Sequence, residues 1–323
     1  MIWFWFGFFA LVALLLFLDL GVLHRRATEP SLKSAAWWTF AWVCLGLAFA
    51  GVVYLIFEYR WLGARITGLA DGDGSDAAIT YVSAYLLEQA LSIDNIFVMS
   101  LLFRSFRVPV KYQHRVLFWG ILGAIVFRIT MLGGGAYLAN RFTWVFYVFG
   151  AYLAWQGLKL LREDDDDDGE HDKSLAVRAL RRFVRIVDGD HGGKFTVRLD
   201  GRRALTTVAV CLVVIELTDI VFALDSIPAV LSVSRDTFIM VTSNIFAIMG
   251  LRSLYFVLAG AMSKFKYLKI ALAVLLMLIG AKMIAHDYSD KIPHAYSLAA
   301  IAGIIGAGVL ASVISNRRSE AGS

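Results

Sequence analysis

The chain has 323 residues, of which 59% are hydrophobic and only 18% are charged, and its formal net charge is +5. This composition excludes an ordinary soluble globular domain, in which about 25% of the residues are charged. Long apolar runs fill most of the sequence, and a membrane-spanning helix needs roughly 20 predominantly apolar residues. The fold class predicted is therefore an all-α polytopic membrane protein.

Nine membrane-spanning helices are predicted in chain order. The first has no Lys or Arg before it and is too long for the core of a signal peptide, so we expect a retained helix. The predicted spans are residues 2–23, 36–57, 78–103, 114–139, 143–161, 204–232, 237–261, 267–286 and 294–315.

Basic residues between the spans predict the orientation. Lys and Arg gather in alternate segments, and basic loops stay on the cytoplasmic side of a membrane. This bias places the N-terminus outside and the C-terminus in the cytoplasm. The anionic inner leaflet then accounts for the positive charge, so we expect lipid and no nucleic acid as a partner. The basic segments are 25–33, 104–115, 173–203, 264–269 and 317–318.

The loop 162–203 is predicted to be the one sizeable soluble segment. It opens with the acidic run 163–168, which we expect to be solvated. Residues 174–187 combine apolar residues with arginines at helical spacing, which predicts a basic amphipathic helix on the lipid surface. Residues 195–203 contain an Asp-Gly pair and predict a β-hairpin.

An acidic motif occurs twice inside the apolar spans. The first copy is Glu88-Gln-Ala-Leu-Ser-Ile-Asp94-Asn95, and the second is Asp219-Ile-Val-Phe-Ala-Leu-Asp225-Ser226. The second copy also has Glu216 one helical turn earlier. Carboxylates at membrane depth are energetically expensive and mark cation sites or proton paths.

Other features repeat with the motif. Each copy is followed by an arginine and then by a Gly-x-Lys sequence, over three predicted spans. Copies with an odd number of spans enter the membrane from opposite sides, as in transporters that bind their substrate between inverted repeats. We predict repeat one at 78–161, repeat two at 204–286, and peripheral helices at 1–57 and 294–315. The repeated residues are Arg128 and Arg252, Gly157 and Gly280, and Lys159 and Lys282.

Helix geometry limits how the acids act together. Asp219 and Asp225 are six residues apart, which separates them by about 120° around a regular helix and about 9 Å along it. Glu88 and Asp94 have the same spacing. Either each acid faces a different neighbour, or the helix is interrupted at the motif. Pro228 favours an interruption in the second copy.

The residue types predict a hard cation held by oxygen ligands. All six histidines lie in loops or at span ends, and Cys44 and Cys211 each stand alone in an apolar span, where we expect small buried hydrophobic residues. A site for a softer metal would use imidazole or thiolate. This leaves Mg²⁺, Ca²⁺ or Mn²⁺, with Na⁺ or H⁺ as monovalent options, and no organic cofactor. The predicted ligands are Glu88, Asp94, Asn95, Glu216, Asp219, Asp225 and Ser226, supported by Arg128 and Arg252 as counter-charges and by Asn244.

These motifs resemble the TerC family of integral membrane proteins, which includes the Alx branch. The resemblance is carried by residues 88–97, 216–228 and 243–252 and extends over nearly the whole chain. It implies Mn²⁺ export across the bacterial inner membrane with the motif acids as ligands. The family name records a link to tellurite resistance, and so acidic a site favours an indirect link over carriage of an oxyanion.

Three alternatives remain at this stage. An intramembrane aspartyl hydrolase would use a single close Asp pair, and five acids in two copies argue against an enzyme. A membrane partner of protein-export or assembly machinery would use the acids only for stability. A transporter of Ca²⁺, Mg²⁺ or a cationic amino acid would use the same site for another substrate. Exchange of the metal ion for protons is a further hypothesis.

Overall fold

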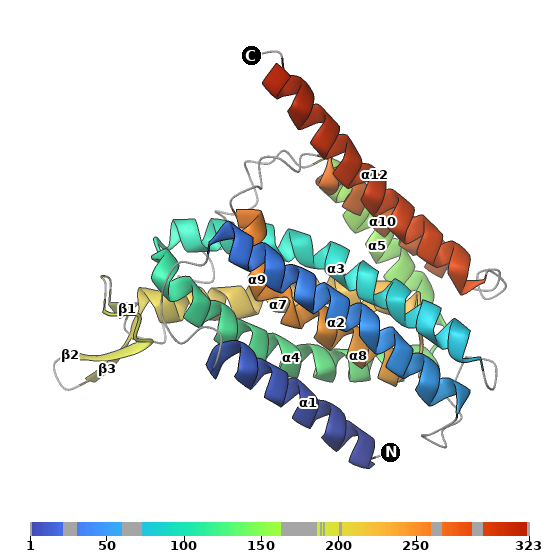
Figure 1. Ribbon diagram of the computed structural model, residues 1–323, viewed down its shortest axis with the longest axis horizontal. Coiled ribbons are helices and arrows are strands. Elements are labelled where there is room, and N and C mark those ends of the chain that lie inside the picture. Colours follow the sequence, from blue (N-terminus) through green and yellow to red (C-terminus); the bar gives the residue numbers. More distant parts are fainter. Residues whose placement is uncertain are drawn as a thin grey trace.

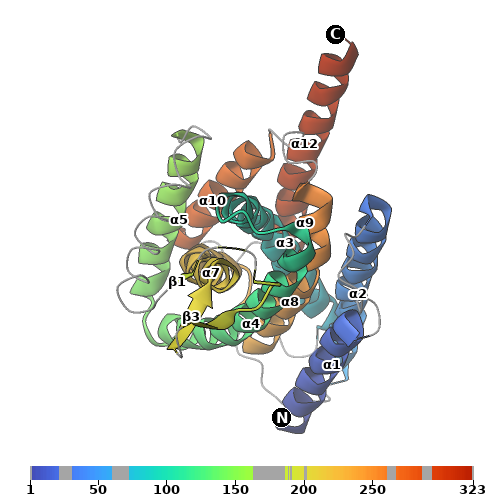
Figure 2. The same ribbon diagram turned by 90° about the vertical axis from the view of Figure 1, so that its left-hand side faces the viewer.

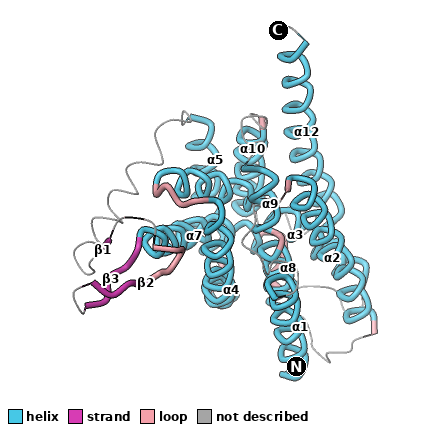
Figure 3. Tube along the Cα trace, turned by 60° about the vertical axis from the view of Figure 1, so that its left-hand side comes forward, coloured by secondary structure: helices cyan, strands magenta, loops and turns pink. Residues whose placement is uncertain are grey.

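The protein is almost entirely helical, as Figures 1 and 3 show. The computed structural model describes residues 2–21, 31–59, 73–162, 186–187, 189, 191–199, 202–259, 267–285 and 293–321. The predicted all-α class is confirmed, and each predicted span contains a helix. The helices are α1 (Ile2–Gly21), α2 (Leu32–Glu58), α3 (Gly74–Ser105), α4 (Val110–Arg141), α5 (Trp144–Arg162), α7 (Thr207–Leu231), α8 (Thr237–Met249), α9 (Leu251–Ala259), α10 (Leu268–Ile284) and α12 (His294–Ala321).

Several helices are long and apolar enough to cross a membrane. Five of the described helices meet this condition, namely α2, α3, α4, α7 and α12, and a sixth span results if the bent pair α8 and α9 is counted as one. α1 contributes a shorter apolar stretch, Trp5–Leu18. A polytopic membrane protein is therefore confirmed, whereas the number nine stays a prediction.

α3 and α7, which carry the two acidic motifs, lie inside the bundle. α7 packs against α3, α4, α5 and α10, and α3 packs against α2, α7, α8 and α12. Figure 2, viewed nearly along α7, shows the neighbouring helices around it. α8 is buried from Phe238 to Met249, which is expected for a helix that is apolar on all sides. Of the motif acids, Glu88 and Asp219 are buried among these helices.

α5 and α10 pack through glycines. A side chain on Gly150 would meet the Gly280 carbonyl oxygen at 2.8 Å, and one on Gly157 would meet the Ala273 carbonyl oxygen at 2.6 Å. These pairs show that the two helices run antiparallel with their backbones in contact. When repeat one is aligned with repeat two so that Gly157 matches Gly280, Gly150 matches Ala273. Under this alignment the contact of Gly150 with Gly280 becomes the contact of Ala273 with Gly157, so each contact is the counterpart of the other. An inverted repeat predicts this reciprocity, and the relation of the whole repeats stays a prediction.

The helices that carry the acidic motifs are continuous. α7 runs through Pro228 to Leu231, so the interruption that Pro228 favoured is wrong. Proline removes one backbone hydrogen bond, and here it lies less than one turn from the end of the helix, where little of the helix remains to be disrupted. The break occurs at Gly250, where α8 and α9 meet with a bend of 44°.

A small sheet lies at one end of the bundle (Figure 1). β2 (Thr196–Leu199) and β3 (Arg202–Thr206) are antiparallel, with Leu199 opposite Arg202, so the predicted hairpin is confirmed, while its Asp-Gly turn lies outside the described residues. β1 (Ile186–Val187) pairs with β3 in parallel. These last residues of the predicted amphipathic helix are therefore a strand, as their β-branched side chains favour. Residues 174–185 and the acidic run 163–168 lie outside the described residues.

The sheet region is attached to the start of α4. The Arg115 guanidinium donates a hydrogen bond to the Gly193 carbonyl oxygen at 3.2 Å and lies over the Phe195 ring at 5.2 Å from its centroid. Gly193 has φ +69°, and the Tyr112 ring occupies the space of a side chain there. Glycine is required at this position both by its backbone conformation and by the close approach of the tyrosine.

Candidate cation-binding site

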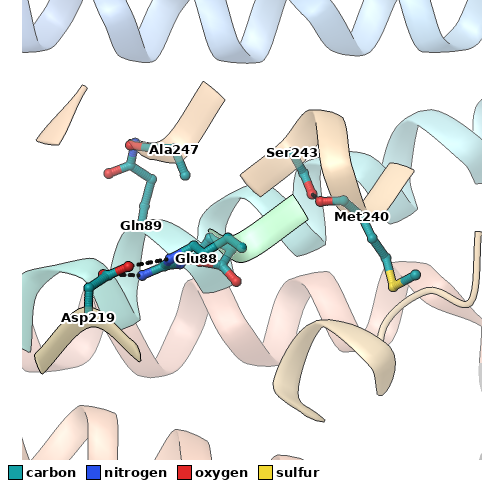
Figure 4. Close-up of polar contacts among 7 residues, drawn as sticks. Glu88, Gln89, Asp219, Met240, Ser243 and Ala247 are labelled. Carbon is teal, nitrogen blue, oxygen red and sulfur yellow. Dashed lines mark hydrogen bonds and ion pairs between the residues drawn. The ribbon is translucent and has the colours of Figure 1, made fainter. Parts of the chain in front are cut away.

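A buried ion pair joins three helices at the centre of the bundle. Arg128 of α4 donates through Nη1 to Glu88 Oε2 of α3 at 2.7 Å, and through Nη2 to Asp219 Oδ1 of α7 at 3.1 Å. A longer contact of 3.4 Å joins Arg128 Nε to Asp219 Oδ2. In Figure 4 the dashed lines beside Asp219 mark its contacts with the guanidinium. The three side chains are 0% to 5% exposed, so they form a fully desolvated group.

The two acids on Arg128 are the first acids of the two motif copies. Asp219 receives two guanidinium nitrogens, Nε and Nη2, whereas Glu88 receives a single hydrogen bond from Nη1. A buried charge is tolerated only when it is paired and hydrogen-bonded. Arg128 thus lies between the two acids as their counter-charge. Arg252 is also buried, at 3% exposure, and its role stays a prediction.

Glu216 adds a third carboxylate beside this ion pair. It lies on the same face of α7 as Asp219, one turn earlier, and the two acids interact electrostatically. The Glu216 carboxylate fills the space that a side chain on Gly123 of α4 would occupy. Glycine at this position thus lets the acid rest against the α4 backbone. Three carboxylates against one guanidinium leave an excess of negative charge inside the bundle.

Asp225 belongs to a separate polar group between α7 and α5. Gln156 Nε2 donates to both Asp225 carboxylate oxygens, at 3.0 and 3.2 Å, and contacts the Tyr152 hydroxyl at 3.1 Å. Lys159, one turn after Gln156, also acts on Asp225 electrostatically. Asp225 is half-buried. Asp219 and Asp225 thus face different neighbours, which was the first of the two geometric alternatives.

The remaining predicted ligands are Asp94 and Asn95 on α3 and Ser226 on α7. Asp94 is half-buried on α3, Asn95 is 4% exposed, and Ser226 is 3% exposed with a hydroxyl that has no hydrogen-bond partner among the described residues. Within the described ranges, no group of three or more His, Cys, Asp or Glu side chains could hold a metal ion. The seven predicted ligands are therefore not gathered around one point in this conformation.

Some side chains differ from the sequence-based expectation. Cys211 is buried as predicted, whereas Cys44 is exposed on the outer face of α2, and both are free thiols. The sequence reasoning missed Gln156 and Tyr152. An amide inside an otherwise apolar predicted span was a usable signal, because polar side chains at membrane depth need partners.

Comparison with known proteins decides the family. Residues 73–320 match the Integral membrane protein TerC family. The chain belongs to the TerC family. It is 42% identical over 313 residues to "Uncharacterized membrane protein STKORF319" of Myxococcus xanthus, covering 97% of this chain and 92% of that protein. It is 41% identical over 302 residues to "Putative membrane-bound redox modulator Alx" of Escherichia coli (strain K12), covering 93% of this chain and 91% of that protein.

A more distant relative extends the same picture. An "Uncharacterized membrane protein" of Rickettsia felis is 36% identical over 310 residues, which is 96% of this chain and 97% of that protein. No solved structure matches the chain. The TerC match begins at α3 and includes all the side chains of the ion pair and of the Asp225 group, while α1 and α2 precede it. The resemblance inferred from the acidic motifs is thus confirmed.

Proposed function

We propose that this TerC protein is a secondary transporter that exports a divalent hard cation, Mn²⁺, from the bacterial cytoplasm across the inner membrane. The observation that carries the proposal is the excess of carboxylates over guanidinium around Glu88, Arg128 and Asp219, buried at the centre of the bundle. Buried negative charge attracts cations and disfavours an oxyanion.

The ligand types narrow the class of cation. Carboxylate, amide and hydroxyl oxygens suit Mg²⁺, Ca²⁺ and Mn²⁺ better than softer metals. The choice of Mn²⁺ within this group rests on the family resemblance. No organic cofactor and no catalytic reaction form part of the proposal.

Alternating access of two inverted repeats is the proposed mechanism, with the N-terminus outside and the C-terminus in the cytoplasm. The reciprocal glycine contacts of α5 and α10 support it, since these helices would be the third helix of each repeat. Inward protons are the proposed coupling ions, because carboxylates that release a metal ion can accept protons. A rate of Mn²⁺ transport that ignores an imposed pH gradient would contradict the coupling.

Several relatives are named as membrane-bound redox modulators. A thiol–disulfide role in this chain would depend on Cys44 and Cys211, its two cysteines. Cys44 lies exposed on α2 and Cys211 is buried in α7, and both are free. Reactive thiols occur in accessible, electropositive surroundings, and the apolar burial of Cys211 is the opposite. The buried acids therefore favour cation transport over thiol chemistry.

One observation favours a second candidate. Glu88 and Asp219 are already held by Arg128, and the described side chains include no ready cluster of three metal ligands. These features fit a membrane partner of protein-export or assembly machinery in which the acids serve stability.

Metal transport by the purified full-length protein in sealed vesicles separates the two candidates. The wild type, Asp94→Asn and Asp225→Asn are compared for metal content and for Mn²⁺ flux, with Mg²⁺ as competitor. Saturable flux that both substitutions abolish supports the exporter. Absent flux, or flux that survives both substitutions, would give the assembly partner the lead.

A further inference from the structure

One side of the ion pair contains buried polar atoms that have no hydrogen-bond partner. Glu88 Oε2 binds Arg128, but Glu88 Oε1 has no partner in the described structure. The same is true of both polar atoms of the Asn244 side chain on α8 and of the Ser92 hydroxyl on α3. These three residues are 0% to 1% exposed. Because buried polar atoms are nearly always satisfied, such a group points to a ligand.

Glu88 and Asn244 lie near each other, and Ser92 lies on the same face of α3 as Glu88. α3 packs against α8, and the Asn244 amide approaches the Glu88 carboxyl, although its atoms do not reach hydrogen-bonding geometry. Ser92 lies one turn after Glu88 on the same face of α3. In Figure 4, Glu88 lies between Asp219 on one side and the turn of α8 with Met240 and Ser243 on the other. Asn244 follows Ser243 on that helix.

The charges also favour a cation at this place. Asp219 contacts Arg128 through two nitrogens and neutralises it, so the charge of Glu88 is only partly engaged by its single hydrogen bond. The second carboxylate oxygen of Glu88, which has no hydrogen-bond partner in the described structure, therefore has negative charge available for a cation. A hard cation prefers this combination of carboxylate and neutral oxygens, and it fills its other positions with water.

The second motif copy lacks the neutral oxygens. Aligning Glu88 with Asp219 places Ser92 on Ala223, and aligning Arg128 with Arg252 places Gly120 on Asn244. The counterpart interface between α4 and α7 therefore has an acid but neither the amide nor the hydroxyl. Two related halves would thus provide one such site instead of two.

We propose that the transported divalent cation binds between α3 and α8, with Glu88 Oε1 and Asn244 Oδ1 as its protein ligands. The Ser92 hydroxyl provides a further neutral oxygen on the same side of α3. This assignment rests on the proposed function and specifies where the cargo binds. Arg128 stays on the other oxygen of Glu88 and orients the carboxylate, while Asp225 lies outside this site.

The test measures Mn²⁺ affinity and thermal stabilisation of the purified full-length protein in detergent. Asn244→Leu keeps the size of the side chain and is expected to weaken Mn²⁺ binding about tenfold or more, because one ligand is lost. Ser92→Ala is expected to weaken it about threefold. Asn244→Asp, which adds a second carboxylate, is expected to bind Mn²⁺ more tightly.

Ser243→Ala is the matched control. Ser243 is the buried neighbour of Asn244, and its hydroxyl already donates to the Met240 carbonyl oxygen at 3.1 Å. This variant should bind Mn²⁺ like the wild type and should show the same increase in melting temperature on adding Mn²⁺.

Two results would overturn the assignment in distinguishable ways. If Asn244→Leu folds and binds Mn²⁺ like the wild type while Asp225→Asn does not, the protein transports the ion through another site. If the wild type itself neither binds nor transports Mn²⁺, the proposed function fails and the site with it.

Discussion

Two acids on the same helix, Asp219 and Asp225, have opposite surroundings. Asp219 is fully buried and shares a guanidinium with an acid from the other motif copy. Asp225 is half-buried and receives its hydrogen bonds from an uncharged amide of α5. Both oxygens of Asp219 contact the buried arginine, which holds this carboxylate in place, whereas Asp225 is bound by an uncharged amide and can change partners more readily. The first and last acids of the motif copy on α7 therefore have different surroundings.

Replacing Arg128 should have the largest effect on stability. Arg128→Met leaves two buried carboxylates without their counter-charge, which is expected to reduce the free energy of unfolding by about 3–5 kcal/mol. Unfolding in mixed micelles measures this loss. The triple variant Glu88→Gln, Arg128→Met, Asp219→Asn removes all three charges and should regain most of the stability. Equal stability of Arg128→Met and the wild type would refute a structural role for the ion pair.

The two acids should then respond differently to the same substitution. Asp219→Asn leaves Arg128 with one carboxylate and is expected to lower the free energy of unfolding by about 2–3 kcal/mol. Asp225→Asn keeps hydrogen-bonding capacity beside Gln156 and should lower it by about 1 kcal/mol or less. The same unfolding assay compares the variants side by side. Similar losses for both would show that the two surroundings are energetically equivalent.

The packing of α5, which carries Gln156 of the Asp225 group, against α10 should be sensitive to a single added methyl group. Gly157→Ala forces a methyl group against the Ala273 carbonyl oxygen and is expected to lower the free energy of unfolding by about 1–3 kcal/mol. Gly133→Ala is the control, because no atom lies within 4 Å of its added carbon. Its helix should be as stable or slightly more stable, by up to about 1 kcal/mol. Destabilisation by both variants would contradict the close packing of α5 and α10.

Substitution of Asp236, which lies between α7 and α8, should have the smallest effect on stability. Asp236 Oδ1 accepts hydrogen bonds from the Phe238 and Ile239 amides at the start of α8, at 2.7 and 3.1 Å. Asp236→Ala should therefore lower the free energy of unfolding by about 1 kcal/mol, while Asp236→Asn keeps the cap.

The pH dependence of Asp236 follows from its burial, which raises the pKa of its carboxyl in the folded protein. A raised pKa means that the folded state binds a proton more readily than the unfolded state, so this contribution to stability is lost as pH rises. The wild type should gain stability relative to Asp236→Asn when the pH is lowered toward the ordinary range of an Asp carboxyl. A difference that does not vary with pH would contradict this assignment.

Sequence reasoning succeeded where a local pattern determines the outcome. The apolar runs predicted each described helix of the bundle, and the Asp-Gly pair predicted the hairpin from Leu199 to Arg202. It also predicted Arg128 as a counter-charge of the buried acids, and the structure pairs it with Glu88 and Asp219.

It failed where the outcome depends on which helices become neighbours. The pairing of Asp225 with Gln156 depends on how α5 packs against α7, and nothing in either segment alone encodes it. Pro228 suggested a broken helix, but its effect depends on its distance from the helix end. The partnerless atoms of Ser92 and Asn244 became evident only when α3 and α8 were placed together.

The glycine contacts between α5 and α10 determine where movement can take place. Because the two backbones touch, few side chains between them can rearrange, and the helices behave as one rigid pair. A displacement of this pair would change its boundaries with α7 and α12, and at the boundary with α7 Gln156 binds Asp225. That hydrogen bond therefore reports the position of the α5 and α10 pair relative to α7. A cysteine or fluorescent probe at this boundary would follow the conformational cycle directly.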